Sequence, residues 1–120
     1  MITLIPERWQ SKVALTATIT LTLIIAVLTL SPSNSVPSVG NQDKLYHFVA
    51  FAALIFPIAF LQPNKLGPLA IGLAIFYGGA IEVIQPSVGR TMSFLDFVAD
   101  AFGVGGGVLA ARLLHRMGLG

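Results

Sequence analysis

The chain has 120 residues, of which 55% are hydrophobic and only 10% are charged, and its formal net charge is +2. Its mean hydropathy of +0.84 excludes an ordinary soluble domain of this size, and its small, scattered positive charge does not indicate nucleic acid as a partner. The absence of cysteine excludes disulfides, thiol chemistry and Cys-based metal sites. We therefore expect a single membrane domain over residues 1–120.

The first apolar segment, Val13–Leu30, contains no charged residue. With a rise of about 1.5 Å per residue it would span roughly 27 Å, close to the thickness of the hydrocarbon core of a bilayer. A cleaved signal peptide is the alternative, because the basic residues Arg8 and Lys12 precede the segment. However, the segment is longer than the usual apolar core of a signal peptide, and no clear A-x-A cleavage site follows it. An uncleaved transmembrane helix is therefore the preferred interpretation.

Three more apolar segments follow, separated by connections that are rich in turn-forming residues. The stretch 31–42 contains several Pro, Ser and Asn residues, and the stretches 62–65 and 86–92 are short. Pro57 predicts a kink within its helix, and Pro86 predicts the end of a helix. The sequence thus predicts an all-α fold, a four-helix transmembrane bundle, with helices at about 13–30, 45–61, 66–85 and 93–114.

The distribution of Lys and Arg predicts the orientation of this bundle. Five of these residues fall at one end of a four-span bundle and two fall at the other, and the more basic end of a membrane protein generally faces the cytoplasm. Both termini are therefore predicted to be cytoplasmic, and the connections 31–44 and 86–92 are predicted to face outward. The five are Arg8, Lys12, Lys65, Arg112 and Arg116, and the two are Lys44 and Arg90.

The acidic residues of the last three segments lie at the predicted outer ends of the helices. In the fourth segment, Asp96 and Asp100 share one helix face with the small residues Gly103 and Gly107. Small residues allow helices to pack closely in a membrane, so we expect this face to point into the bundle and to carry the carboxylates with it. The sequence therefore predicts a polar site at the outer membrane face where distant segments converge, formed by Asp43, Lys44, His47, Glu82, Gln85, Arg90, Asp96 and Asp100.

Two sequence blocks resemble the VanZ-like family of small integral membrane proteins, which is named after a teicoplanin-resistance protein. The first block is "DKLYHFVAFAALIF" (Asp43–Phe56), and the second is "YGGAIEVIQPSVGRTMSFLDFVADAFGVGGG" (Tyr77–Gly107). The family pattern is D-K-x-x-H-F, then Y-G-x-x-I-E-x-x-Q, then G-R, and finally L-D-x-x-x-N followed by glycines. Position 100 is Asp here, where the pattern usually has Asn, and this change adds a charge. The resemblance implies a small membrane protein but no particular activity.

Two interpretations of the ionisable residues remain open. They could form a structural network of ion pairs that clamps three helices together, in which Arg90 bridges Asp96 or Glu82. They could instead form a functional polar site, because ionisable groups inside a membrane are costly to retain and usually functional. No cofactor is expected. No metal is expected either, since His47 belongs to neither an H-x-x-H nor an H-E-x-x-H motif, although these side chains offer one nitrogen and several oxygens.

Two classes of function fit this pattern in a multi-pass protein of a bacterial inner membrane. The first is a binding protein for a membrane lipid headgroup, a cell-envelope precursor or another membrane protein, in which Arg90 and Lys44 would contact phosphate. The second is an intramembrane hydrolase or transferase acting on a lipid-linked substrate, with His47 or Glu82 as general base. No catalytic motif supports the enzyme, so binding is preferred. A transporter is the weakest alternative, because the sequence shows no inverted repeat.

Overall fold

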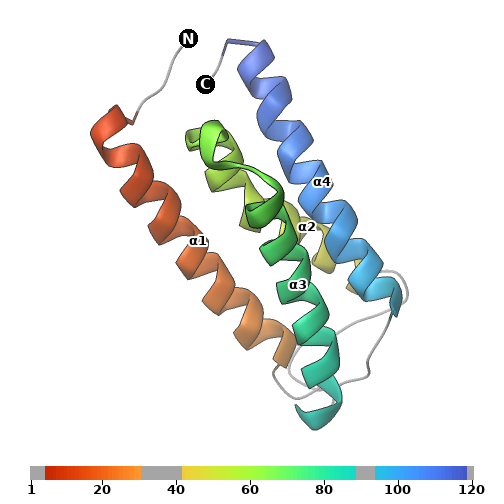
Figure 1. Ribbon diagram of the computed structural model, residues 1–120. Coiled ribbons are helices and arrows are strands. Elements are labelled where there is room, and N and C mark those ends of the chain that lie inside the picture. The colour runs from red at the N-terminus through yellow and green to blue at the C-terminus, as the bar shows by residue number, and fades with distance from the viewer. Residues whose placement is uncertain (1–4, 31–41, 89–93, 119–120) are drawn as a thin grey trace.

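The computed structural model describes residues 5–30, 42–88 and 94–118, and this part of the chain is helical without a strand (Figure 1). All four α-helices are long and apolar enough to cross a membrane, which confirms the predicted all-α four-helix fold and is consistent with a multi-pass membrane protein. The elements are α1 (Glu7–Leu30), α2 (Gln42–Leu61), η1 (Pro63–Lys65), α3 (Pro68–Ile84), η2 (Gln85–Val88) and α4 (Phe94–Arg116), where η denotes a 3-10 helix.

The helices run up and down, so their ends gather in two groups (Figure 1). The start of α1, the connection between α2 and α3, and the end of α4 lie at one end of the bundle. The end of α1, the start of α2, the end of α3 and the start of α4 lie at the other end, which we call the site end. The side of the membrane that each end faces stays a prediction.

The main difference from the predicted boundaries is at α1, which begins at Glu7 rather than near residue 13. Hydropathy identifies the part of a helix that lies in lipid, whereas the helix itself can extend into polar residues beyond that part. Pro6 precedes the first turn and Glu7 lies within it, and an acidic residue there interacts favourably with the helix dipole. At the other boundaries, α2 continues through Pro57, and α3 ends at Ile84, two residues before Pro86.

The contact between α2 and α4 is the most extensive in the bundle. Gly103 and Gly107 of α4 are buried there, and a Cβ atom added to either would collide with the backbone of α2. At Gly103 the atom in the way is the carbonyl oxygen of Phe48, and at Gly107 it is the carbonyl oxygen of Ala52. The two backbones therefore approach more closely than larger side chains would allow, as small residues permit in membrane proteins.

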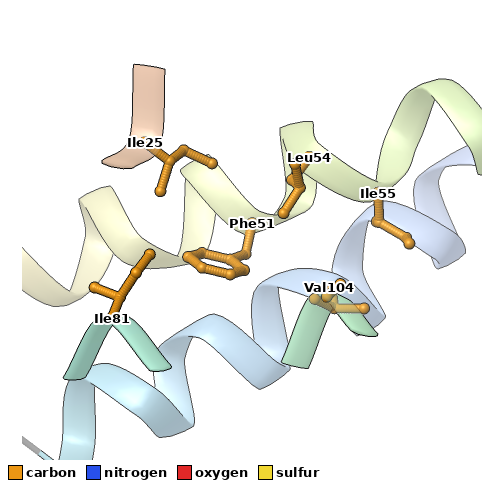
Figure 2. Close-up of a cluster of buried hydrophobic side chains, with 7 residues drawn as sticks. Ile25, Phe51, Leu54, Ile55, Ile81 and Val104 are labelled. Atoms are coloured by element: carbon orange, nitrogen blue, oxygen red, sulfur yellow. The ribbon is translucent and has the colours of Figure 1, made fainter. Parts of the chain in front are cut away.

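A cluster of buried apolar side chains joins all four helices on the side of the site end that faces the middle of the bundle. The side chains labelled in Figure 2 are Ile25 from α1, Phe51, Leu54 and Ile55 from α2, Ile81 from α3 and Val104 from α4. The Phe51 ring has no exposed surface. Phe51 and Val104 each lie one helical turn from an ionisable residue, His47 and Asp100 respectively, so this packing sets the depth and direction of those side chains.

α1 is held to the rest of the bundle partly by side chains that reach its backbone. The hydroxyl of Tyr77 in α3 donates a hydrogen bond to the carbonyl oxygen of Thr22. The amide Nε2 of Gln85 in η2 donates to the carbonyl oxygen of Thr29, at 3.1 Å. Thr29 lies in the last turn of α1, where carbonyls have no partner within the helix, so the bond from Gln85 satisfies a group that the helix itself leaves open.

The glycine contacts predict opposite effects of the same substitution at neighbouring positions. Gly103→Ala and Gly107→Ala should lower the free energy of unfolding by about 1–3 kcal/mol, because each added methyl group displaces the backbone of α2. Gly105→Ala is the matched control, since a Cβ atom there meets nothing within 4 Å. It should be neutral or stabilise the protein by up to about 1 kcal/mol through helix propensity. Unfolding in detergent micelles, followed by circular dichroism, measures all three, and equal effects would contradict the close contact.

Candidate intramembrane polar site

Four ionisable side chains from three helices lie together at the site end of the bundle. They are His47 from α2, Glu82 from α3, and Asp96 and Asp100 from α4, and we call them the polar cluster. None is more than 4% exposed, and Asp100 is completely buried. Segments that are 53 residues apart in the sequence therefore meet inside the bundle.

His47 lies at the centre of the polar cluster. Its Nδ1 atom is 2.7 Å from Oδ1 of Asp100 and 4.0 Å from Oε1 of Glu82. Its Nε2 atom is 3.7 Å from Oδ2 of Asp96. A neutral imidazole donates a hydrogen bond from one nitrogen only, whereas an imidazolium donates from both. Each ring nitrogen thus faces a carboxyl group, and the nearest of these belongs to Asp100.

The packing of the helices explains why these side chains meet. Asp96 and Asp100 are four residues apart, so they lie on the same face of α4. Gly103 continues this face and lies against the backbone of Phe48 in α2. Because Phe48 follows His47 directly, this close approach of the two helices brings the imidazole of His47 beside Asp100. On the opposite side, a Cβ atom at Gly78 of α3 would lie only 2.8 Å from Oδ2 of Asp100. The glycine at position 78 therefore leaves the space that this carboxyl group fills.

Gln85 lies near the polar cluster in the sequence but has a different partner. Its side chain is only 2% exposed, and its Nε2 atom donates to Thr29 of α1. Its Oε1 atom is buried and has no hydrogen-bond partner within the described part of the chain. Gln85 thus connects α1 to the site end, whereas the residues of the polar cluster join α2, α3 and α4.

Of the three remaining candidates from the sequence, the structure describes the side chain of Lys44. Lys44 is half-buried and forms no ion pair with a carboxylate of the described residues. Asp43 lies in the first turn of α2, but its side chain is outside the described part of the structure. Arg90 also lies outside the described residues. The predicted bridge from Arg90 to Asp96 or Glu82 therefore stays a prediction.

The polar cluster combines several ionisable groups in a buried position. Three carboxyl groups share this interior with one imidazole. An ionised carboxylate in a protein interior costs several kcal/mol unless hydrogen bonds, protons or opposite charges compensate for it. Retaining these carboxyl groups in the bundle is therefore costly in a way that ordinary apolar packing is not.

An apolar groove of about 520 Å³ runs between α3 and α4 at the same end of the bundle. Val83 and Ile84 at the end of α3 and Phe97 in the first turn of α4 line it, together with residues further along α3. Glu82 precedes Val83 and Asp96 precedes Phe97, so the groove and the polar cluster lie at similar depth. The sequence offered no signal for this groove, because its lining residues come from two separate helices.

Two features of the site were not predicted. The sequence predicted His47 and Asp100 as members of one site, but not that Asp100 is the nearest carboxyl group to His47 among those described. The space left by Gly78 for the Asp100 carboxyl group was also missed. The only signal was that Gly78 lies four residues before Glu82, on the same face of α3.

Comparison of the chain with protein-family models, curated proteins and solved structures finds no match in any of the three. The class of protein is therefore defined by its fold and its site alone. It is a helical bundle with four helices that are able to cross a membrane and with a buried cluster of ionisable side chains at one end.

A double-mutant cycle tests the contact at the centre of the cluster. His47→Gln and Asp100→Asn should show a coupling of about 1–3 kcal/mol in the free energy of unfolding in micelles, because the 2.7 Å contact is buried. His115→Gln with Asp100→Asn is the matched control, since His115 lies in the last turn of α4. Its coupling should stay below about 0.5 kcal/mol. Similar coupling in both pairs would show that His47 and Asp100 are not in contact.

Proposed function

We propose that this chain is a VanZ-like multi-pass membrane protein that binds the polar headgroup of a membrane lipid or lipid-linked envelope precursor at the polar cluster. The observation that carries the proposal is the convergence of His47, Glu82, Asp96 and Asp100 in a buried position at one end of the bundle. Ionisable groups in such a position are costly, and in membrane proteins they commonly serve a ligand or a reaction.

The chemistry of the cluster favours a headgroup that carries hydrogen-bond donors. Carboxylates accept hydrogen bonds from hydroxyl and amine groups, which sugars and amino headgroups provide. Lys44 lies three residues before His47, and Arg90 lies in the connection between Glu82 and Asp96, so both are near enough in the sequence to contact a phosphate. A ligand with a phosphate and a sugar or amine group would use both sets of residues.

The apolar groove between α3 and α4 supports a lipid rather than a free polar molecule. The groove is lined by apolar residues and lies at a depth similar to that of the cluster. A lipid could place its headgroup at the polar cluster while one of its chains lies along the groove. A soluble ligand would gain nothing from this apolar surface.

A second candidate function, an intramembrane enzyme, is favoured by one contact. Oδ1 of Asp100 lies 2.7 Å from Nδ1 of His47, which is the relation of an orienting carboxylate to a general-base histidine in many hydrolases. His47 or Glu82 would then act as general base on a lipid-linked substrate. Turnover of a panel of lipid-linked phosphates by the purified protein tests this candidate, and an absence of turnover that accompanies saturable binding would favour the binding protein.

Isosteric substitutions separate binding from structural clamping. Glu82→Gln and Asp96→Asn exchange a carboxyl group for an amide, and His47→Gln exchanges the imidazole for an amide, all at nearly constant volume, so each should leave the yield of folded protein similar to wild type. Each should also lower the retention of co-purified lipid by at least about tenfold, because charged hydrogen bonds to the headgroup are lost. Native mass spectrometry of protein extracted in mild detergent measures both quantities.

Glu7→Gln is the matched control, since Glu7 is exposed and lies at the opposite end of the bundle. It should keep both folded yield and lipid retention. If the three cluster variants instead lose folded protein while the remaining folded fraction retains lipid normally, the cluster is a clamp and the proposed function is wrong.

The orientation in a bacterial inner membrane is also part of the proposal, and the lack of native cysteine makes it simple to test. Ser87→Cys in η2 and Asn64→Cys in η1 each introduce one thiol at an exposed position, at opposite ends of the bundle. A membrane-impermeant thiol reagent added to whole cells should label the first variant and not the second. The reverse pattern would place the site end and its polar cluster at the cytoplasmic face.

A further inference from the structure

Three donor atoms of the polar cluster lie close enough together to hold one ion. One atom each from His47, Glu82 and Asp100 lies within 4.8 Å of the other two, and all three residues are buried. We propose that these residues form a binding site for a divalent first-row metal ion, with Asp96 as the outer partner of His47. The site rests on the cluster of the proposed function, but metal binding itself requires no lipid.

The spacing of the donor atoms suits a single small ion. Ligands at about 2.0–2.2 Å from a metal lie roughly 3–3.6 Å from one another in common geometries. The Nδ1 atom of His47 is 2.7 Å from Asp100 and 4.0 Å from Glu82, values that lie on either side of this range. A bound ion would therefore replace the 2.7 Å contact between His47 and Asp100 and would require Glu82 to lie closer to His47.

The contacts that His47 makes within the polar cluster agree with this arrangement. Metal-bound histidines almost always direct their other ring nitrogen at a carboxylate or carbonyl, which orients the ring. Here Nδ1 faces Glu82 and Asp100, while Nε2 faces Oδ2 of Asp96 at 3.7 Å. A single imidazole thus has two ligand-type carboxyl groups on one side and one outer carboxyl group on the other.

The charge of the cluster also fits a cation. A divalent ion would interact favourably with carboxyl groups in an interior that solvates charge poorly. Zn²⁺ and Mn²⁺ suit a set of one imidazole and two carboxylates, whereas Ca²⁺ requires six to eight oxygen ligands and Mg²⁺ usually retains several waters. No sequence motif signals this site, because its three ligands come from three helices rather than from two positions on one helix.

Mn²⁺ binding to the full chain in detergent tests this proposal directly. After removal of metal with a chelator, the protein should bind one Mn²⁺ per chain, and spin-echo modulation of the bound Mn²⁺ should show coupling to an imidazole nitrogen. His47→Gln should lose this coupling. Glu82→Gln and Asp100→Asn should weaken Mn²⁺ and Zn²⁺ binding by at least about tenfold, and Asp96→Asn should weaken it by about 10- to 100-fold.

His115→Gln is the matched control, because the ring of His115 stacks on Phe60, far along α4 from the cluster. This variant should keep the nitrogen coupling and the affinity. The proposal is overturned if wild-type protein shows no nitrogen coupling, if His47→Gln retains it, or if Glu82→Gln and Asp100→Asn both bind Mn²⁺ like wild type. If a variant does not fold, the presence or absence of nitrogen coupling in the spectrum of the wild-type protein decides whether the proposal stands.

A parallel measurement of lipid retention in excess chelator separates the two proposals. Retained lipid together with a failed Mn²⁺ experiment would overturn the metal site and leave the headgroup site standing. Bound Mn²⁺ with nitrogen coupling, but no retained lipid in any metal state, would support the metal site and overturn the headgroup site.

Discussion

The cost of burying charge in an apolar interior governs the arrangement of this bundle. Glu82, Asp96 and Asp100 could face lipid only at a penalty of a few kcal/mol each, so the helices that carry them turn those faces toward one another. The imidazole of His47 lies where the three faces meet, within 4.0 Å of a carboxyl oxygen from each residue. The rotation of α2, α3 and α4 about their axes thus follows from the position of a few polar side chains in an otherwise apolar protein.

The same helix faces carry the glycines, and this links the stability of the bundle to the geometry of its site. Gly103 and Gly107 bring the backbones of α2 and α4 together, while Gly78 lies against the carboxyl group of Asp100. A larger residue at any of these positions would separate the helices or displace a cluster side chain. At a similar depth in the bundle, the apolar packing around Phe51 joins all four helices. Packing and polar contacts therefore depend on one another.

The sequence predicted the helices well because apolar length and proline position are local signals, and the end of α3 just before Pro86 is an example. The inward face of α4 was also predictable, since Asp100, Gly103 and Gly107 share a helical period. The pairing of His47 with Asp100 was not predictable, because it depends on how far α2 is shifted along α4. The early start of α1 was missed because polar residues can extend a helix beyond the membrane-spanning stretch.

The attachment of α1 has a consequence for the order of events during synthesis. Tyr77 follows Thr22 by 55 residues, and Gln85 follows Thr29 by 56. At roughly 5–20 residues per second, α1 precedes these two donors by about 3–11 s. α1 must therefore remain beside the nascent chain, with the Thr29 carbonyl still lacking the donor from Gln85, until both α3 and the start of η2 have been made.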